Sequence, residues 1–348
     1  MSRWVWICML IAAVVRVGAA TGLPMDSDEP IYLQSANHYA SAVGDGEYGH
    51  LLDQPYNPEH PALIKLAHGL ALVPLGTDSG LVHQLAVVRG LQVGGGVLLA
   101  GVLAHIHPAA GLAAAVHTLH AKYTAQGYLE AWPMLAMLVA LIAWGRICAQ
   151  PTSRWVLILG VSIGVAGAGK LIHALPAVVL LVDLAWRQWR LLGPVLLACA
   201  LTMLLLDPGL WLDPVGRLEY RFLHHAGYAP DIPQPWWLPL VAIGGVLPTQ
   251  WHPDVFPLSL DPMLLVLGVS GLVRSAWRGA EHKGLARVAL AWLILCMGFV
   301  MAWPTRWAQH ALVVLVPVCI GVGMLVADRF RLSSIRFGPS GSRRPAGE

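Results

Sequence analysis

Long apolar runs recur along almost the whole of this 348-residue chain and restrict its fold more than any other feature. Several of them reach the ~17–25 residues that a helix needs to cross a bilayer. Only 12% of the residues are charged, about half of the ~25% that is typical of soluble proteins. Since lipid offers no hydrogen-bond partners to a peptide backbone, such runs must be helical. The sequence therefore predicts an all-α polytopic membrane protein.

Hydropathy and helix breakers predict about ten transmembrane helices. We expect these spans near residues 3–21, 81–103, 108–122, 129–147, 153–168, 171–186, 191–207, 259–277, 285–303 and 309–328. Two shorter apolar pieces, at 61–76 and 236–249, are bounded by prolines. We expect them to be re-entrant or juxtamembrane helices within two large external loops, which cover about 22–80 and 208–258.

The distribution of charge predicts how this bundle is oriented. With both termini in the cytoplasm, most of the 22 basic residues fall on the cytoplasmic side, as the positive-inside rule requires. The same topology puts most of the 19 carboxylates in the outer half. Charged groups near a membrane interior are costly and usually functional. We therefore expect a site on the external face, which for a bacterial inner membrane is the periplasmic face.

The chain is expected to form one functional unit. Residues 1–330 would make a single transmembrane domain, and residues 331–348 a disordered basic cytoplasmic tail. Outside this tail no basic face recurs, so the expected partners include membrane lipids but no nucleic acid. The five cysteines lie in or beside apolar segments and form no CxxC pair, which argues against disulfides and thiolate metal sites.

Residues 25–65 form the longest polar stretch and carry seven carboxylates. Asp28 and Glu29 directly precede Pro30, and proline is favoured in the first turn of a helix. A carboxylate at a helix N-terminus stays ionised because the helix dipole lowers its pKa, and an ionised carboxylate can act as a general base. Asp28 and Glu29 are therefore candidate catalytic residues, with a simple acidic helix cap as the alternative.

Histidines and cations at the outer ends of other segments are candidate ligands for an anion such as a lipid-linked phosphate. They are His60, Lys65, Lys122, Lys170, His224 and Arg306. Lys65 has an alternative interpretation, because a lysine at the interface can extend its ammonium group to the headgroups. Glu130 would begin a helix that faces the loop of Asp28 and is the third candidate acid. His224 and His225 point apart on a helix, so the pair does not indicate a metal site.

Several short segments occur in a characteristic order along the chain. They are MDSDEPIY, NPEHPALIKL, VVRGLQVGGG, YTAQGYLEAWPML, GVAGAGKLIHALPAVVL, DPGLWLDPVGRLEYRFLHH, PWWLPLV and TRWAQHALVVLVPVCIGVG. Each resembles a motif of the GT-C superfamily of membrane glycosyltransferases, and together they cover most of the chain. The most similar branches are the protein O-mannosyltransferases and the aminoarabinose lipid A transferases.

The resemblance implies transfer of a monosaccharide from a polyprenyl-phosphate donor to a hydroxyl group on a protein, lipid or glycan acceptor. Asp28 matches the family's general base, which takes the proton of the acceptor hydroxyl. Glu29 and Glu130 would orient the acceptor or the sugar. The basic residues that would stabilise the leaving phosphate are Lys65, Arg89 and Lys170. The lipid-linked sugar is a substrate, and neither a cofactor nor a divalent metal is indicated.

Two other functions stay open at this point. The same charged residues would suit a transporter or a lipid-handling protein, or a non-catalytic protein built on the GT-C scaffold. Transporters tend to have inverted repeats and broken helices at the membrane midplane. Here the charges cluster at the outer ends of the predicted spans, which favours the enzyme.

Overall fold

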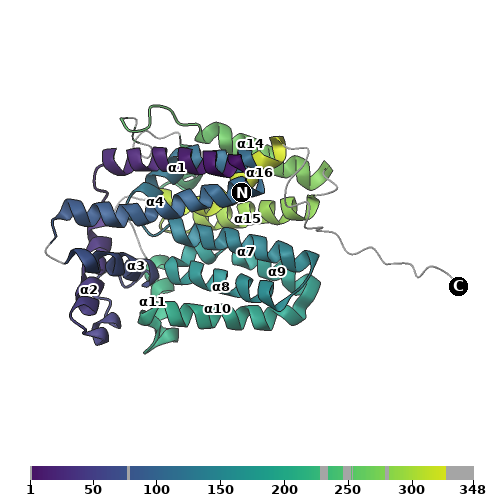
Figure 1. The fold of residues 1–348 in the computed structure, drawn as a ribbon. Coiled ribbons are helices and arrows are strands. Elements are labelled where there is room, and N and C mark those ends of the chain that lie inside the picture. Colours follow the sequence, from purple (N-terminus) through teal and green to yellow (C-terminus); the bar gives the residue numbers. More distant parts are fainter. Residues whose placement is uncertain are drawn as a thin grey trace.

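The computed structural model describes residues 2–76, 79–227, 234–245, 252, 254–278 and 282–326. Within these ranges the protein is helical and has no β-strand, as the sequence predicts. Its α-helices are α1 (Arg3–Gly22), α2 (Glu29–Gly44), α3 (Leu63–Leu72), α4 (Leu81–Ile106), α5 (Pro108–Val116), α6 (Thr118–Ala125), α7 (Ala131–Ala149), α8 (Ser153–Gly169), α9 (Ala177–Gln188), α10 (Leu192–Leu206), α11 (Pro214–Ala226), α12 (Leu238–Ile243), α14 (Asp261–Arg278), α15 (Lys283–Ala302) and α16 (Leu315–Val326). The long helices lie side by side as a bundle (Figure 1).

Six segments in the described part of the chain are long and apolar enough to cross a membrane. They are Arg3–Gly22, Leu81–Ile106, Ala131–Ala149, Leu171–Leu206, Lys283–Ala302 and Ala308–Val326. Leu171–Leu206 contains both α9 and α10, and α8 is apolar but only 17 residues long. The prediction of an integral membrane protein is confirmed, whereas the count of about ten spans is not.

The two short apolar pieces form short helices. α3 has 10 residues and α12 has 6, which correspond to about 15 and 9 Å at ~1.5 Å per residue. The hydrocarbon core of a bilayer is ~30 Å thick, so neither helix can cross it. Residues 246–250 lie outside the described ranges, as does the predicted tail at 331–348.

The helix predicted over residues 108–122 is broken at His117 into α5 and α6. Arg16 of α1 donates to two carbonyls in the last turn of α5 at 3.0 and 3.1 Å. Asp261 of α14 accepts from the first two N–H groups of α6 at 2.8 and 3.0 Å. Each buried charge lies at the helix end whose dipole it complements. The polar groups freed by the break are thus satisfied inside the bundle.

The bundle brings the predicted site residues to one of its ends. α2, α3 and α11 lie together there (Figure 1). α7 begins after Glu130 and α8 ends before Lys170, and these two side chains are in contact. Because α7 and α8 are antiparallel, Arg146 and Arg154 lie at the opposite end of the bundle. The membrane orientation that the positive-inside rule predicts stays a prediction.

Three glycines allow α14 and α16 to pack closely. A Cβ atom on Gly271 would lie 1.9 Å from the carbonyl oxygen of Gly321, and one on Gly321 would lie 2.0 Å from that of Gly268. Small residues at such contacts are typical of helix packing in membranes. No larger side chain fits here without moving the backbone.

We expect Gly271→Val to lower the thermal unfolding temperature of the purified protein in detergent. Overpacking costs ~1–3 kcal/mol and occasionally more, and the clash here is with backbone. The matched control is Gly298→Val in α15, where an added Cβ meets nothing within 4 Å. Equal unfolding temperatures for the two variants would contradict the close packing of α14 and α16.

Candidate active site

An ion pair between Glu29 and Arg89 fixes the start of α2. Arg89 Nε donates to Oε1 at 2.8 Å and Nη2 to Oε2 at 2.7 Å. The remaining N–H groups of Arg89 donate to three backbone carbonyls in and just after the last turn of α1. The two oxygens of Glu29 also accept from the backbone N–H groups of Gly127 and Asp26. Both side chains are buried, and their hydrogen-bonding capacity is filled within the protein.

Asp28 directly precedes Glu29 in the sequence and occupies the N-cap position of α2. Its side chain makes no capping hydrogen bond, so the interpretation as a simple acidic cap is not met. The Ser27 hydroxyl donates to it weakly, at 3.4 Å, and no ion pair with Asp28 occurs among the described residues. Burial raises the pKa of the Asp28 carboxyl. The charge of Lys170 lowers it, while Asp26 and Glu130 add to the increase.

Asp26 lies in a different environment, two residues away. It accepts a hydrogen bond from the Tyr128 hydroxyl at 2.5 Å. It also forms an ion pair with Lys122, whose Nζ lies 3.3 Å from Oδ2 of Asp26. Burial alone would raise the pKa of Asp26, but Tyr128 and Lys122 together hold it below its ordinary value. Two nearby carboxyls thus have pKa values moved in opposite directions. Such a separation assigns different protonation states to neighbouring acids in enzyme sites.

Glu130 and Lys170 form a buried ion pair where α7 and α8 meet. Glu130 also accepts the backbone N–H of Leu129 at 2.7 Å. An ammonium group has three N–H donors, and Glu130 is the one hydrogen-bond acceptor that Lys170 Nζ has in the described part of the chain. Lys170 therefore keeps donors for a ligand, and its charge reaches Asp28.

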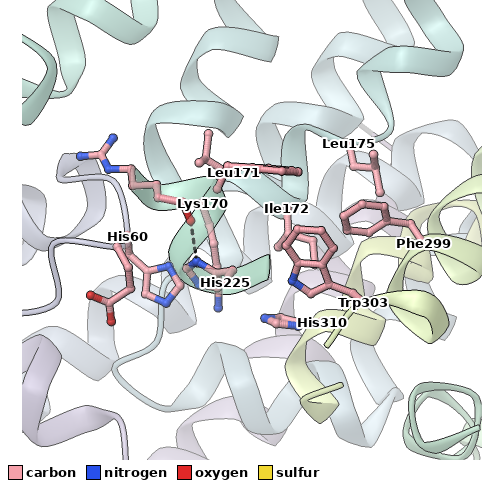
Figure 2. A pocket seen from close by; sticks show the side chains of 12 residues that line it. His60, Lys170, Leu171, Ile172, Leu175, His225, Phe299, Trp303 and His310 are labelled. Carbon is pink, nitrogen blue, oxygen red and sulfur yellow. Dashed lines mark hydrogen bonds between the residues drawn. The ribbon is translucent and has the colours of Figure 1, made fainter. Parts of the chain in front are cut away.

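A cavity of about 240 Å³ opens beside Lys170 (Figure 2). Its apolar lining consists of Leu171, Ile172, Leu175, Phe222, Phe299 and Trp303. Its polar lining consists of Glu59, His60, Lys170, Arg221, His225 and His310. In Figure 2 Leu175 and Phe299 lie on one side and His60 on the other. The cavity therefore suits an amphipathic ligand with a charged head and an apolar tail.

Two histidines of the cavity have a fixed tautomer. Nδ1 of His225 lies 2.9 Å from the carbonyl oxygen of Arg221, and Nδ1 of His310 lies 2.8 Å from that of Thr305. A carbonyl can only accept, so each Nδ1 carries a hydrogen and Nε2 is the atom that gains or loses a proton. Burial lowers the pKa of His225. It lowers the pKa of His60 further, to well below the ordinary value of a histidine.

Several residues expected to bind phosphate lie elsewhere. Lys65 Nζ donates to the carbonyls of Asn57 and His60 at 2.7 and 2.9 Å, and burial lowers its pKa to about 7. It holds the turn before α3 and does not line the cavity. Arg306 donates to two backbone carbonyls, at 2.9 and 2.5 Å. His224 is exposed and also does not line the cavity, so the structure leaves it outside the site.

The sequence analysis did not select five residues that the structure brings into the site. They are Asp26, Glu59, Arg221, His225 and His310. Arg221 and His225 are four residues apart, and this spacing puts them on one face of α11. The spacing is a signal that would have favoured His225 over His224. For His310, which lies at the start of an apolar segment, the sequence offers no comparable signal.

Metal binding has no visible basis in the described residues. No group of three His, Cys, Asp or Glu side chains there is arranged to hold a metal ion. The five cysteines are unpaired and none lines the cavity.

Comparison with solved structures finds this fold in ArnT from Cupriavidus metallidurans, an aminoarabinose lipid A transferase and GT-C glycosyltransferase. ArnT bound to undecaprenyl phosphate matches with a TM-score of 0.62 at 16% identity, covering 93% of this chain and 59% of ArnT. The apo form matches with a TM-score of 0.61 at 19% identity and the same coverage. The chain thus spans less than two thirds of ArnT, and the resemblance to GT-C proteins is confirmed for the fold. No protein-family model and no curated protein matches the sequence.

We expect Arg89→Gln to destabilise the protein by about 3–5 kcal/mol, because it leaves Glu29 buried without a cation. The double variant Glu29→Gln/Arg89→Gln should recover part of this loss. Unfolding in detergent measures the effect. The control is Arg187→Gln, which breaks a partly exposed pair with Asp183 worth at most about 1 kcal/mol. Equal effects of Arg89→Gln and Arg187→Gln would contradict a structural role for the buried pair.

Proposed function

We propose that this integral membrane protein is a glycosyltransferase that moves a monosaccharide from a polyprenyl-phosphate donor to a hydroxyl group at the external face of the membrane. For a bacterial protein this would be the periplasmic face of the inner membrane. The observation that carries the proposal is Asp28, a half-buried carboxylate that has no ion pair among the described residues. The charge of Lys170, which lines the amphipathic cavity, acts on it. The likeness of the fold to ArnT supports it.

Asp28 is suited to act as the general base. It would accept the proton of the acceptor hydroxyl while the hydroxyl oxygen attacks the anomeric carbon of the donor. The bond between that carbon and the phosphate oxygen breaks, and the lipid phosphate leaves as an anion. Because attack and departure occur on opposite faces of the sugar, the anomeric configuration inverts. The proton then passes from Asp28 to solvent.

The leaving group needs positive charge more than it needs an acid, because it departs already ionised. Lys170 supplies N–H donors at the polar end of the cavity. Its pairing with Glu130 fixes its position. Arg89 has no donor left for this task, since all five of its N–H groups are bound. We therefore assign Lys170 to the phosphate and make Arg89 and Glu29 positioning residues.

The apolar wall of the cavity would hold the first isoprene units of the lipid carrier. Phe222, Phe299 and Trp303 form much of this wall, and Phe299 and Trp303 stack with ring centroids 4.7 Å apart. Such a wall recognises an apolar chain without fixing its length. ArnT has been crystallised with undecaprenyl phosphate, a ligand of this chemical class.

Replacement of the proposed base gives the most direct test. We expect Asp28→Asn to reduce sugar transfer by about 10²–10⁴-fold, the usual contribution of a general base, with unchanged membrane insertion and unfolding. The measurement is transfer of label from a panel of labelled polyprenyl-phosphate sugars in membranes. The matched control is Asp45→Asn at the other, exposed end of α2. Normal transfer by the Asp28 variant would contradict its assignment as the base.

The pH dependence of transfer gives a second test. Burial raises the pKa of Asp28 above its ordinary value of 3.8, so the carboxyl stays protonated, and inactive as a base, to a higher pH than an exposed aspartate. Activity should fall as the pH drops through this raised pKa. Lys170 lowers the pKa of Asp28, and Lys170→Met should therefore move the acid limb of kcat/KM to higher pH. An unmoved limb would show that another group is titrating.

A further inference from the structure

The permanent cations that border the cavity are already paired. Lys170 is bound to Glu130, and Arg221 is bound to both oxygens of Asp207. Glu59 adds a carboxylate to the lining. When its histidines are neutral, the cavity therefore has no excess of positive charge with which to hold an anionic phosphate.

Three histidines line the same cavity and can supply the missing charge. The rings of His60 and His225 have centroids 5.1 Å apart. Burial and the charge of Lys170 lower the pKa of both rings, so the charge of a bound anion is what would favour their protonated form. Figure 2 shows these rings around Lys170. His225 and His310 are held at Nδ1 by carbonyls, and no described residue is hydrogen-bonded to either Nε2. Each ring can thus gain a proton at Nε2 without breaking a bond.

The other titratable or charged groups near these rings do not supply the positive charge that the cavity lacks when its histidines are neutral. They are Asp28 and Glu130 near Lys170, Lys65 behind His60, His173 beside His310, and His224 beside His225. Lys65 uses its ammonium group on two backbone carbonyls. His173 and His224 do not line the cavity.

We propose that the cavity binds the phosphate of its lipid carrier together with a proton, which is taken up at Nε2 of His225 or His310. This inference rests on the proposed function and adds a regulation to it. A phosphate monoester carries nearly two negative charges at neutral pH, whereas a phosphodiester that bears a sugar carries one. The spent carrier therefore recruits the proton more strongly than the donor does. When the spent carrier is released, the histidine loses that proton again.

The sign of the pH effect follows from linkage. A bound phosphate favours the imidazolium form, so binding takes up a proton and weakens as the pH rises. For one linked proton the affinity falls about tenfold per pH unit between the pKa values of the free and bound histidine. A diester probe keeps a single charge over this range, so its pH dependence comes from the protein alone.

Isothermal titration calorimetry can count the protons. The full-length protein in detergent is titrated with farnesyl phosphate, and separately with methyl farnesyl phosphate, at about pH 7.5, above the histidine range. Each titration is repeated in buffers of different ionisation enthalpy. We expect uptake of about one proton with the monoester and less with the diester. The double variant His225→Gln/His310→Gln should lose this uptake, and the control His224→Gln should keep it.

The outcomes separate this inference from the proposed function. Tight monoester binding without proton uptake by the unmodified protein overturns proton-coupled binding but leaves the transferase intact. Full uptake by the double variant overturns the assignment to His225 and His310. Absence of monoester binding at any pH overturns both proposals. Loss of transfer in Asp28→Asn bears only on the base, because Asp28 is not a group that takes up this proton.

Discussion

The ion pair between Glu29 and Arg89 determines where α2 begins and, through it, where Asp28 lies. Arg89 extends from α4 to the end of α1 and to the first residue of α2, so three segments are held in one arrangement. A buried ion pair adds little net stability, because desolvation offsets the attraction between the charges. Its geometry, however, can be satisfied in few ways. We infer that the main role of this pair is to hold the start of α2 in place, and with it the neighbouring residue Asp28.

The same logic extends to the other charges at this end of the bundle. Buried charges in an apolar environment must be paired or become neutral. The pairs are Glu29–Arg89, Glu130–Lys170, Asp207–Arg221 and Asp26–Lys122. Asp28 and Glu59 have no ion pair among the described residues, and burial raises the pKa of Asp28. Under the proposed function the proton is taken by Asp28, while the neighbouring Glu29 and Glu130 are held in their pairs.

The class of fold could be predicted from the sequence because lipid permits few solutions, and long apolar runs must be helical. The break at His117 was not predicted, because polar residues after position 116 are compatible with the end of one span as well as with a break inside it. The charges that stabilise the break, Arg16 and Asp261, come from distant segments. The acidic motif indicates Asp28 and Glu29 together, but the difference between the two depends on Arg89, which pairs with Glu29 and lies 60 residues further along the chain. Likewise, Lys65 has the residue type expected of a phosphate ligand, yet nearby carbonyls occupy its ammonium group.

The position of the site at one end of the bundle follows from the two substrates it would join. Under the proposed function, a lipid phosphate would reach the protein along an apolar wall and an acceptor hydroxyl would approach from water, so the two would meet near the interface. Partial burial there would also suit Asp28 as the proposed base. The environment that raises the pKa of Asp28 makes it a stronger base once ionised, and it also strengthens the hydrogen bonds that Lys170 can donate to a departing phosphate. The ion pairs around the site hold Lys170 and the backbone of Asp28 in place, so that one region of low polarity would support both halves of the proposed reaction.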